Sequence, residues 1–182
     1  MHYIESVSIL KNNANILGLT IEVVNLKDIR QREENWLFDT GYIQTIDFTN
    51  AIFTNVSSLD ETDDTSGILL INTLDLNSEF DIAIKNILID NSSVNFISFG
   101  SIVNTPTTSK HLEISNFTYT NSFIETERKL LSTDGIEVDE NLFILLNKIT
   151  FTRLSFIEAG SLISFGHQLS DYVEVNELEI DN

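Results

Sequence analysis

The chain has 182 residues, of which 42% are apolar, and it carries 28 Asp and Glu against 10 Lys and Arg, for a formal net charge of -18. This length and composition allow a sizeable buried core, whereas the acidic surface excludes nucleic acid as a partner and disfavours anionic membranes. The absence of cysteine excludes disulfide bonds and thiolate metal sites.

The most apolar window, residues 142–165, is interrupted by Lys148, Arg153 and Glu158, so we expect no membrane insertion. The first residues do not combine a basic region with an apolar stretch, as a secretory signal would. If the protein is secreted, we expect the signal to lie upstream of Met1.

A short repeat recurs along the chain, in which an apolar stretch, often alternating, leads into an Asn. In one copy, Ile82 and Ile84 precede Asn86, and a further apolar residue, Leu88, follows it. Period-two alternation predicts a strand, and Asn suits a bend because it tolerates the left-handed backbone region. The Asn residues that mark the copies are Asn25, Asn50, Asn86, Asn116, Asn147 and Asn176, which lie 25, 36, 30, 31 and 29 residues apart.

Repeats of this length predict a solenoid, and stacked coils would align these Asn side chains into a hydrogen-bonded ladder. A third strand in each coil is indicated by Phe96–Gly100, which matches Phe156–Gly160, and by Gly67 before another apolar run. We expect the mainly polar stretches 58–66, 104–110 and 125–134 to form loops between strands.

These motifs resemble the right-handed parallel β-helices of the pectin-lyase-like superfamily. The pairing of Gly100–Ile102 and Gly160–Leu162 with Ile52–Asn55 and Leu88–Asn91 is similar to the repeats of polymorphic outer-membrane adhesins and of large surface proteins of ciliates. The resemblance implies an all-β, right-handed parallel β-helix with three short strands per coil. We expect residues 1–182 to form one segment of about six coils, cut from a longer array.

A leucine-rich-repeat-like solenoid is the structural alternative, because Phe80–Ile89 can be placed on that pattern. No segment with helical periodicity follows it, and the residues after each Asn stay rich in Ser, Thr, Phe and Ile, which favours strands.

No catalytic residue is predicted. His2, His111 and His167 lie far apart in the sequence, with no evident Ser or Asp arrangement around them. The enzymatic alternative is a polysaccharide lyase or hydrolase that uses outward carboxylates. Its candidate residues are Asp47, Asp81 and Glu113.

We expect no cofactor, and the acidic run between residues 60 and 64 is the main candidate for calcium. A looser acidic group is formed by Asp134, Glu137, Asp139 and Glu140. Carboxylate oxygens are the ligands that calcium prefers, but the run follows no known loop spacing. A solvated acidic loop is therefore the simpler interpretation. The candidate ligands are Asp60, Glu61, Asp63 and Asp64.

Three N-x-S/T sequons begin at Asn55, Asn91 and Asn116. Asn55 and Asn91 are the candidate glycan acceptors, since they lie at strand exits. We expect Asn116 to be shielded, because a ladder residue would face inward. The aromatic residues near strand positions, among them Phe48, Phe96, Phe143 and Phe156, are also predicted to face the core.

The sequence thus predicts a structural or adhesive solenoid, extracellular or on a cell surface, that can belong to a filament. Its predicted partners are other proteins, further copies joined through coil ends, or carbohydrate. The alternatives are the carbohydrate-active enzyme and an intracellular scaffold of an organelle or cilium.

Overall fold

The computed structural model describes residues 4–5, 9–11, 15–31, 36–58, 67–72, 80–99, 110–124, 131–132, 142–156, 162–164 and 172–181. Nearly all of these residues lie in strands, and none of them lies in a helix. The strands are β1 (Ile4–Glu5), β2 (Leu10–Lys11), β3 (Asn15–Gln31), β4 (Trp36–Ser58), β5 (Gly67–Asn72), β6 (Phe80–Asp90), β7 (Asn95–Phe99), β8 (Lys110–Thr120), β9 (Phe123–Ile124), β10 (Leu131–Ser132), β11 (Leu142–Thr152), β12 (Ser155–Phe156), β13 (Ile163–Ser164) and β14 (Tyr172–Asp181).

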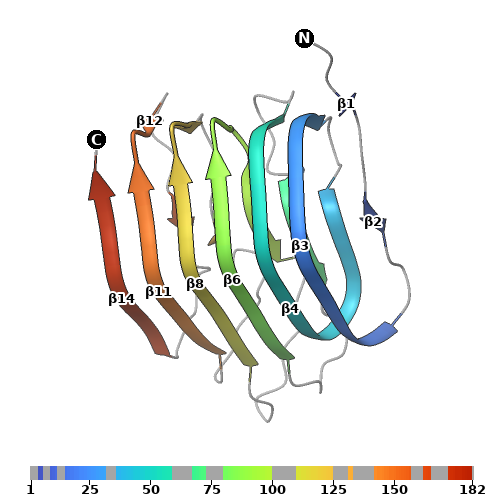
Figure 1. The fold of residues 1–182 in the computed structure, drawn as a ribbon. Coiled ribbons are helices and arrows are strands. Elements are labelled where there is room, and N and C mark those ends of the chain that lie inside the picture. The colour runs from blue at the N-terminus through green and yellow to red at the C-terminus, as the bar shows by residue number, and fades with distance from the viewer. Residues whose placement is uncertain are drawn as a thin grey trace.

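The long strands β3, β4, β6, β8, β11 and β14 lie side by side in chain order and form the main sheet (Figure 1). Every pair in this row is parallel, so Ile84 of β6 lies between Phe48 of β4 and Ile114 of β8. The chain is therefore a parallel β-solenoid, as predicted. The leucine-rich-repeat alternative would place a helix or 3-10 turn in each coil, and the described residues include neither.

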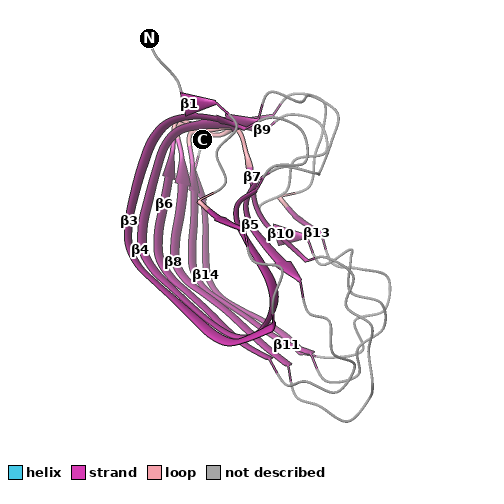
Figure 2. Ribbon diagram, turned by 90° about the vertical axis from the view of Figure 1, so that its right-hand side faces the viewer, coloured by secondary structure: helices cyan, strands magenta, loops and turns pink. Residues whose placement is uncertain are grey.

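Each long strand bends sharply and continues, rather than ending at the bend (Figure 2). In β6 the bend is Asn86, whose φ is 59°. A second residue with positive φ, Asn91, follows five positions later. The two strands predicted on either side of each Asn are thus one bent strand. The residues with positive φ are Val23, Asp28, Asn50, Asn55, Asn86, Asn91, Asn116, Asn121, Lys148, Arg153 and Glu177.

At the first bend, the alternation of inward-facing and outward-facing residues shifts by one position. On β6, Ile82 and Ile84 are buried before the bend, and Ile87 and Ile89 are buried after it. Neighbouring coils repeat this arrangement in register, so the core is a set of apolar rows that run along the stack.

The third face is built from shorter strands: β2, the start of β4, β5, β7, β10 and β13. Here Ile97 of β7 pairs with Leu69 of β5 and Leu131 of β10, whereas Phe156 pairs with Ile124. The predicted equivalence of Phe96–Gly100 with Phe156–Gly160 is therefore wrong. The predicted loop 125–134 also contains a strand, β10.

Gly67 begins β5, as the predicted third strand requires. A Cβ atom at this position would collide with the indole ring of Trp36 and lie 2.7 Å from the Asn95 carbonyl oxygen. Close packing, rather than a special backbone angle, therefore explains this glycine.

Two buried serines hold the chain where it leaves the main sheet. The Ser92 hydroxyl donates to the Asp90 carbonyl (2.8 Å) and accepts from the Val56 amide (3.0 Å). The Ser122 hydroxyl donates to the Thr120 carbonyl (2.6 Å) and accepts from the Ser92 amide (2.9 Å). Each hydroxyl thus joins its own coil to the preceding one, so buried backbone groups at the turn keep their hydrogen bonds.

The aromatic residues follow two different patterns. Phe48 and Phe96 are buried, as predicted, and Phe96 packs on Phe117 with ring centroids 4.9 Å apart. Phe143 points outward, in the same row as His111 and Tyr172, and Phe156 is 47% exposed, so the prediction was wrong for these two residues.

Candidate functional site

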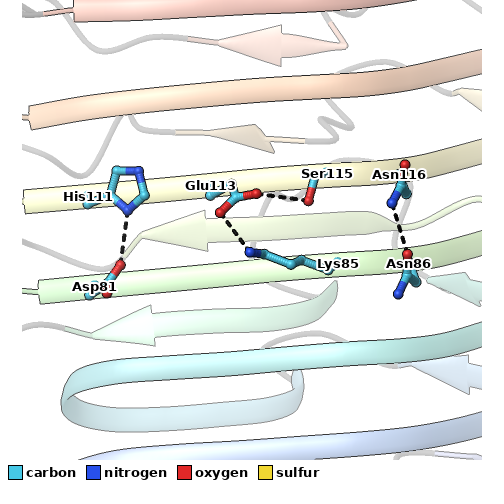
Figure 3. A network of polar contacts seen from close by, with 7 residues as sticks. All are labelled: Asp81, Lys85, Asn86, His111, Glu113, Ser115 and Asn116. Atoms are coloured by element: carbon cyan, nitrogen blue, oxygen red, sulfur yellow. Dashed lines mark hydrogen bonds and ion pairs between the residues drawn. The ribbon is translucent and has the colours of Figure 1, made fainter.

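A polar cluster lies on the outward face of the main sheet, on the adjacent strands β6 and β8 (Figure 3). Its members are Asp81 and Lys85 of β6, and His111, Glu113 and Ser115 of β8. Strand periodicity places them on one face, because residues two apart point the same way and alternate with the buried row. The parallel register then sets β6 residues beside β8 residues, with Asp81 opposite His111 and Lys85 opposite Ser115.

Two contacts cross between the strands and one lies within β8. The Lys85 ammonium lies 2.8 Å from Glu113 Oε2, and the Ser115 hydroxyl donates to Glu113 Oε1 at 3.1 Å. His111 Nδ1 lies 3.0 Å from Asp81 Oδ1, close enough to donate a hydrogen bond to the carboxylate. The lysine and glutamate side chains are 40% and 21% exposed, so the ion pair is only partly shielded from water.

The contacts of Glu113 change the pKa of its carboxyl group. Its burial raises the pKa, but hydrogen bonds from Lys85 and Ser115 and the charges of Lys85 and His111 together outweigh it. The pKa of Glu113 therefore lies below its ordinary value of 4.5. This carboxylate holds its negative charge rather than a proton.

Beside the cluster, three outward aromatic rings form a stack along the solenoid. The His111 and Phe143 ring centroids are 5.3 Å apart with planes 22° from parallel. Phe143 and Tyr172 are also 5.3 Å apart, with planes 8° from parallel. Because the rings cover one another's faces, the stack joins neighbouring strands and does not present an open row of ring faces to a sugar.

The predicted Asn ladder forms in the middle of the sheet. The Asn86 side-chain amide donates to Asn50 Oδ1 at 3.0 Å. The Asn116 amide donates to Asn86 Oδ1, also at 3.0 Å (Figure 3). All three side chains are exposed at the bend, so the prediction that Asn116 faces inward is wrong. Because each amide both donates and accepts, one side chain can link two neighbours.

The other three predicted ladder residues lie outside this row. The bend positions in their coils are occupied by Val23, Lys148 and Glu177. Asn25 pairs with Ile52, and Asn147 lies between Ser115 and Asn176, one position before the bend. In these coils the order of inward-facing and outward-facing residues, rather than the Asn, determines the position of the bend. The prediction was therefore wrong for Asn25, Asn147 and Asn176.

A second row of hydrogen bonds between coils lies near the second bend and was not predicted. The Asn55 amide donates to Asp28 Oδ1 at 2.6 Å, and the Asn121 amide donates to Asp90 Oδ1 at 2.7 Å. The signal was present as an Asn five residues after each central ladder Asn. Of the predicted glycan acceptors, Asn91 is exposed at this second bend and Asn55 is half-buried with its amide engaged.

The carboxylates proposed for an enzyme all face outward but do not converge. Asp47 and Glu113 share one row, with Ala83 between them, and Asp81 lies two positions earlier on β6. Ser115 and His111 are four residues apart on one strand, about 13 Å at strand spacing, so they cannot form a nucleophile and base pair.

Among the described residues, no group of three or more His, Asp or Glu side chains is placed to hold a metal ion. The calcium candidates Asp60, Glu61, Asp63 and Asp64 and the looser acidic group at residues 134–140 lie outside the described residues, as do His2 and His167. Within the part of the chain that the structure describes, there is no long apolar helix that could cross a membrane.

Comparison with known proteins does not place the chain in a family. No family model, curated protein or solved structure matches it.

Proposed function

We propose that the chain is a structural solenoid, a non-catalytic scaffold in an extracellular or cell-surface assembly. The observation that carries this proposal is the use of polar side chains between neighbouring coils. The Asn86 amide bonds to both adjacent coils, and Lys85 pairs with Glu113 one coil away. Groups that could otherwise act on a substrate are used to hold the stack together.

The ion pair and hydrogen bond of Glu113 make this residue unsuited to be the general acid of a polysaccharide hydrolase. Hydrolysis by two carboxyl groups requires one of them to keep a proton until it protonates the leaving oxygen, which needs a raised pKa. The pKa of Glu113 is instead lowered, with Lys85 and Ser115 bound to its oxygens. The carboxylate that lies nearest the centre of the cluster is thus suited to an ion pair.

The proposed location rests on composition and resemblance. A net charge of -18 keeps a protein soluble and discourages association with anionic surfaces. The motifs resemble pectin-lyase-like β-helices and adhesin repeats, and the Asn91 sequon lies on an exposed bend.

The enzymatic alternative is tested by incubating the purified chain with a panel of acidic and neutral polysaccharides. We expect no release of reducing or unsaturated ends. Release that disappears in a Glu113→Gln variant would overturn the scaffold proposal.

The scaffold proposal also predicts that the cross-coil bonds stabilise the fold. Asn86→Ala removes two ladder bonds and puts Ala at a positive φ, so we expect a loss of about 2 kcal/mol in urea unfolding. Asn86→Gly tolerates the backbone angle and should lose about 1 kcal/mol, because only the ladder bonds are missing. Unchanged stability in both variants would contradict a structural role for the ladder.

A further inference from the structure

Asn121 forms the bend that follows β8, and the next residue is a serine. Asparagine is chemically labile, and a small following residue favours its deamidation because the next backbone nitrogen can approach the side-chain carbonyl carbon. The described residues contain one other Asn–Ser pair, Asn91–Ser92, which lies at the same place in the preceding coil. A third pair, Asn77–Ser78, lies outside the described residues.

The two described pairs have closely similar surroundings. Both asparagines are exposed and have φ of 49°, and both serines are buried, with exposures of 1% and 3%. In each pair, the backbone amide of the Asn donates to a carbonyl group of the next coil at 3.1 Å. The shape of the bend and the exposure of the two asparagines therefore do not distinguish the two pairs.

The backbone amide of the serine distinguishes them. The Ser92 amide donates to the Ser122 hydroxyl at 2.9 Å. The register of β9 with β12, continued back by one residue, places Leu154 opposite Ser122, and leucine has no hydroxyl to accept a hydrogen bond. No group among the described residues accepts a hydrogen bond from the Ser122 amide.

We propose that Asn121 is a site of spontaneous deamidation, with the Ser122 backbone nitrogen as the attacking group. This nitrogen loses its proton to hydroxide and forms a bond to the side-chain carbonyl carbon of Asn121. The side-chain nitrogen takes a proton from water and leaves as ammonia, which restores the hydroxide and leaves a cyclic imide. Water then opens the imide at either carbonyl, so the products are aspartate and isoaspartate.

The hydrogen bond of the Ser92 amide protects the other pair. An amide that donates to a hydroxyl must give up that bond before it can lose its proton and attack, whereas the Ser122 amide has no such bond to lose. The energy of one hydrogen bond, added to a reaction barrier, slows the reaction by a factor of about 2 to 10. We therefore expect Asn121 to react faster than Asn91 by about this factor.

The side chain of Asn121 has one contact that acts in the opposite direction. Its amide nitrogen donates to Asp90 Oδ1 at 2.7 Å, which restrains the group that is attacked. This bond lies on the exposed surface, where competition with water leaves little net stabilisation. The bond of the Ser92 amide is buried, so we expect the difference between the two serine amides to determine the order of reaction.

Deamidation would weaken the boundary between β6 and β8. An aspartate at position 121 would place a second carboxylate beside Asp90, where an amide now donates a hydrogen bond. Like charges on neighbouring strands repel, and isoaspartate would also add a methylene group to the backbone at a bend. The reaction would thus act at one defined boundary in the middle of the stack.

The test follows both sites in the folded 182-residue chain during incubation in mildly alkaline buffer, with peptide-mapping mass spectrometry as the readout. We expect Asn121 to deamidate faster than Asn91, and the two rates to become similar when the chain is unfolded in urea. Equal rates in the folded chain, or a faster reaction at Asn91, would overturn the proposal. A difference that stays the same in urea would also overturn it, because local sequence rather than the fold would then be the cause.

Leu154→Ser tests the missing acceptor directly. The new hydroxyl would lie beside Ser122 as the Ser122 hydroxyl lies beside Ser92, so it could accept from the Ser122 amide. Leu154→Ala is the matched control, because it removes the same packing without supplying a hydroxyl. With far-UV circular dichroism to check that both variants fold, we expect Asn121 to deamidate about 2 to 10 times more slowly in Leu154→Ser than in Leu154→Ala. Equal rates in the two variants would show that the serine amide does not control the reaction.

Discussion

The side chain at each bend decides how well the backbone accepts a positive φ. In the central coils Asn occupies both bends, for example Asn86 and Asn91, whereas the first coil has Val23 and Asp28. Asn tolerates this region because its short side chain can bond locally, while a β-branched side chain crowds the backbone. The bends of the outer coils are therefore less favourable than those of the central ones.

Val23→Asn should stabilise the protein. Val23 has φ of 57° and is 78% exposed, so the change relieves backbone strain without disturbing the core. The new amide would also lie beside Asn50 and extend the ladder by one coil. We expect the free energy of unfolding to rise by about 1–2 kcal/mol, measured by urea unfolding.

Val24→Asn is the matched control, because Val24 faces the core row one residue later. It should lower stability, since it buries an amide in an apolar row. A gain in both variants, or in neither, would show that the left-handed bend does not limit the stability of this coil.

The central ladder could be predicted from the sequence because Asn50, Asn86 and Asn116 each follow a clear alternation of inward and outward residues. The outer positions could not be found in this way. Residues 143–146 are all apolar, so their pattern does not reveal which of them face inward, and the bend fell at Lys148 instead of Asn147. Valine disfavours a positive φ, so the φ of Val23 is imposed by its place in the stack and could not be predicted from the residue itself.

Along a single strand, residues that face the core alternate with residues that face water. Ile84 of β6 is fully buried, whereas Ile52, after the bend of the neighbouring strand β4, is 40% exposed. The two positions have the same side chain and lie on strands that pair with each other. A comparison of the two positions therefore isolates the effect of burial on stability.

Ile84→Ala should lower the free energy of unfolding by about 2–5 kcal/mol, because it removes buried methyl groups and leaves a cavity. Ile52→Ala should cost less than about 1 kcal/mol, since its side chain already contacts water. Urea unfolding followed by circular dichroism measures both changes. Similar losses of stability in the two variants would contradict the difference in burial between Ile84 and Ile52.

The long strands could be predicted from the sequence, but the short strands could not. The alternation in Leu112–Ile114 marks β8 without any knowledge of its neighbours. β10 and β13 have two residues each, too few to show a period, and they are strands because they pair with adjacent coils. The predicted equivalence of Phe96 and Phe156 failed for the same reason, because a local match cannot fix which coils pair.

For the whole molecule, acid should weaken the contribution of the polar cluster. The pKa of Glu113 is lowered in the folded state, so unfolding makes this carboxylate bind protons more readily. Its stabilising effect is therefore present above its ordinary pKa of 4.5 and is lost as pH falls through the lower, folded value. Glu113→Gln should cost up to about 1 kcal/mol at neutral pH and progressively less in acid.

Urea unfolding at a series of pH values measures this difference. Asp47→Asn is a suitable control, because it removes the same charge from an exposed position in the same row. A cost of Glu113→Gln that stays constant from neutral pH to strong acid would show that the pair with Lys85 does not stabilise the fold.

The parallel pairing of the main sheet also determines how the molecule should respond to force. The bonds between strands point along the stack, so a pull applied to its two outermost strands loads the boundaries between coils in series, like links of a chain. Each boundary can open on its own, and opening one releases the length of a whole coil while the others stay intact. A solenoid of this kind extends in steps and absorbs work at each step, which would let it yield under load without losing its remaining structure.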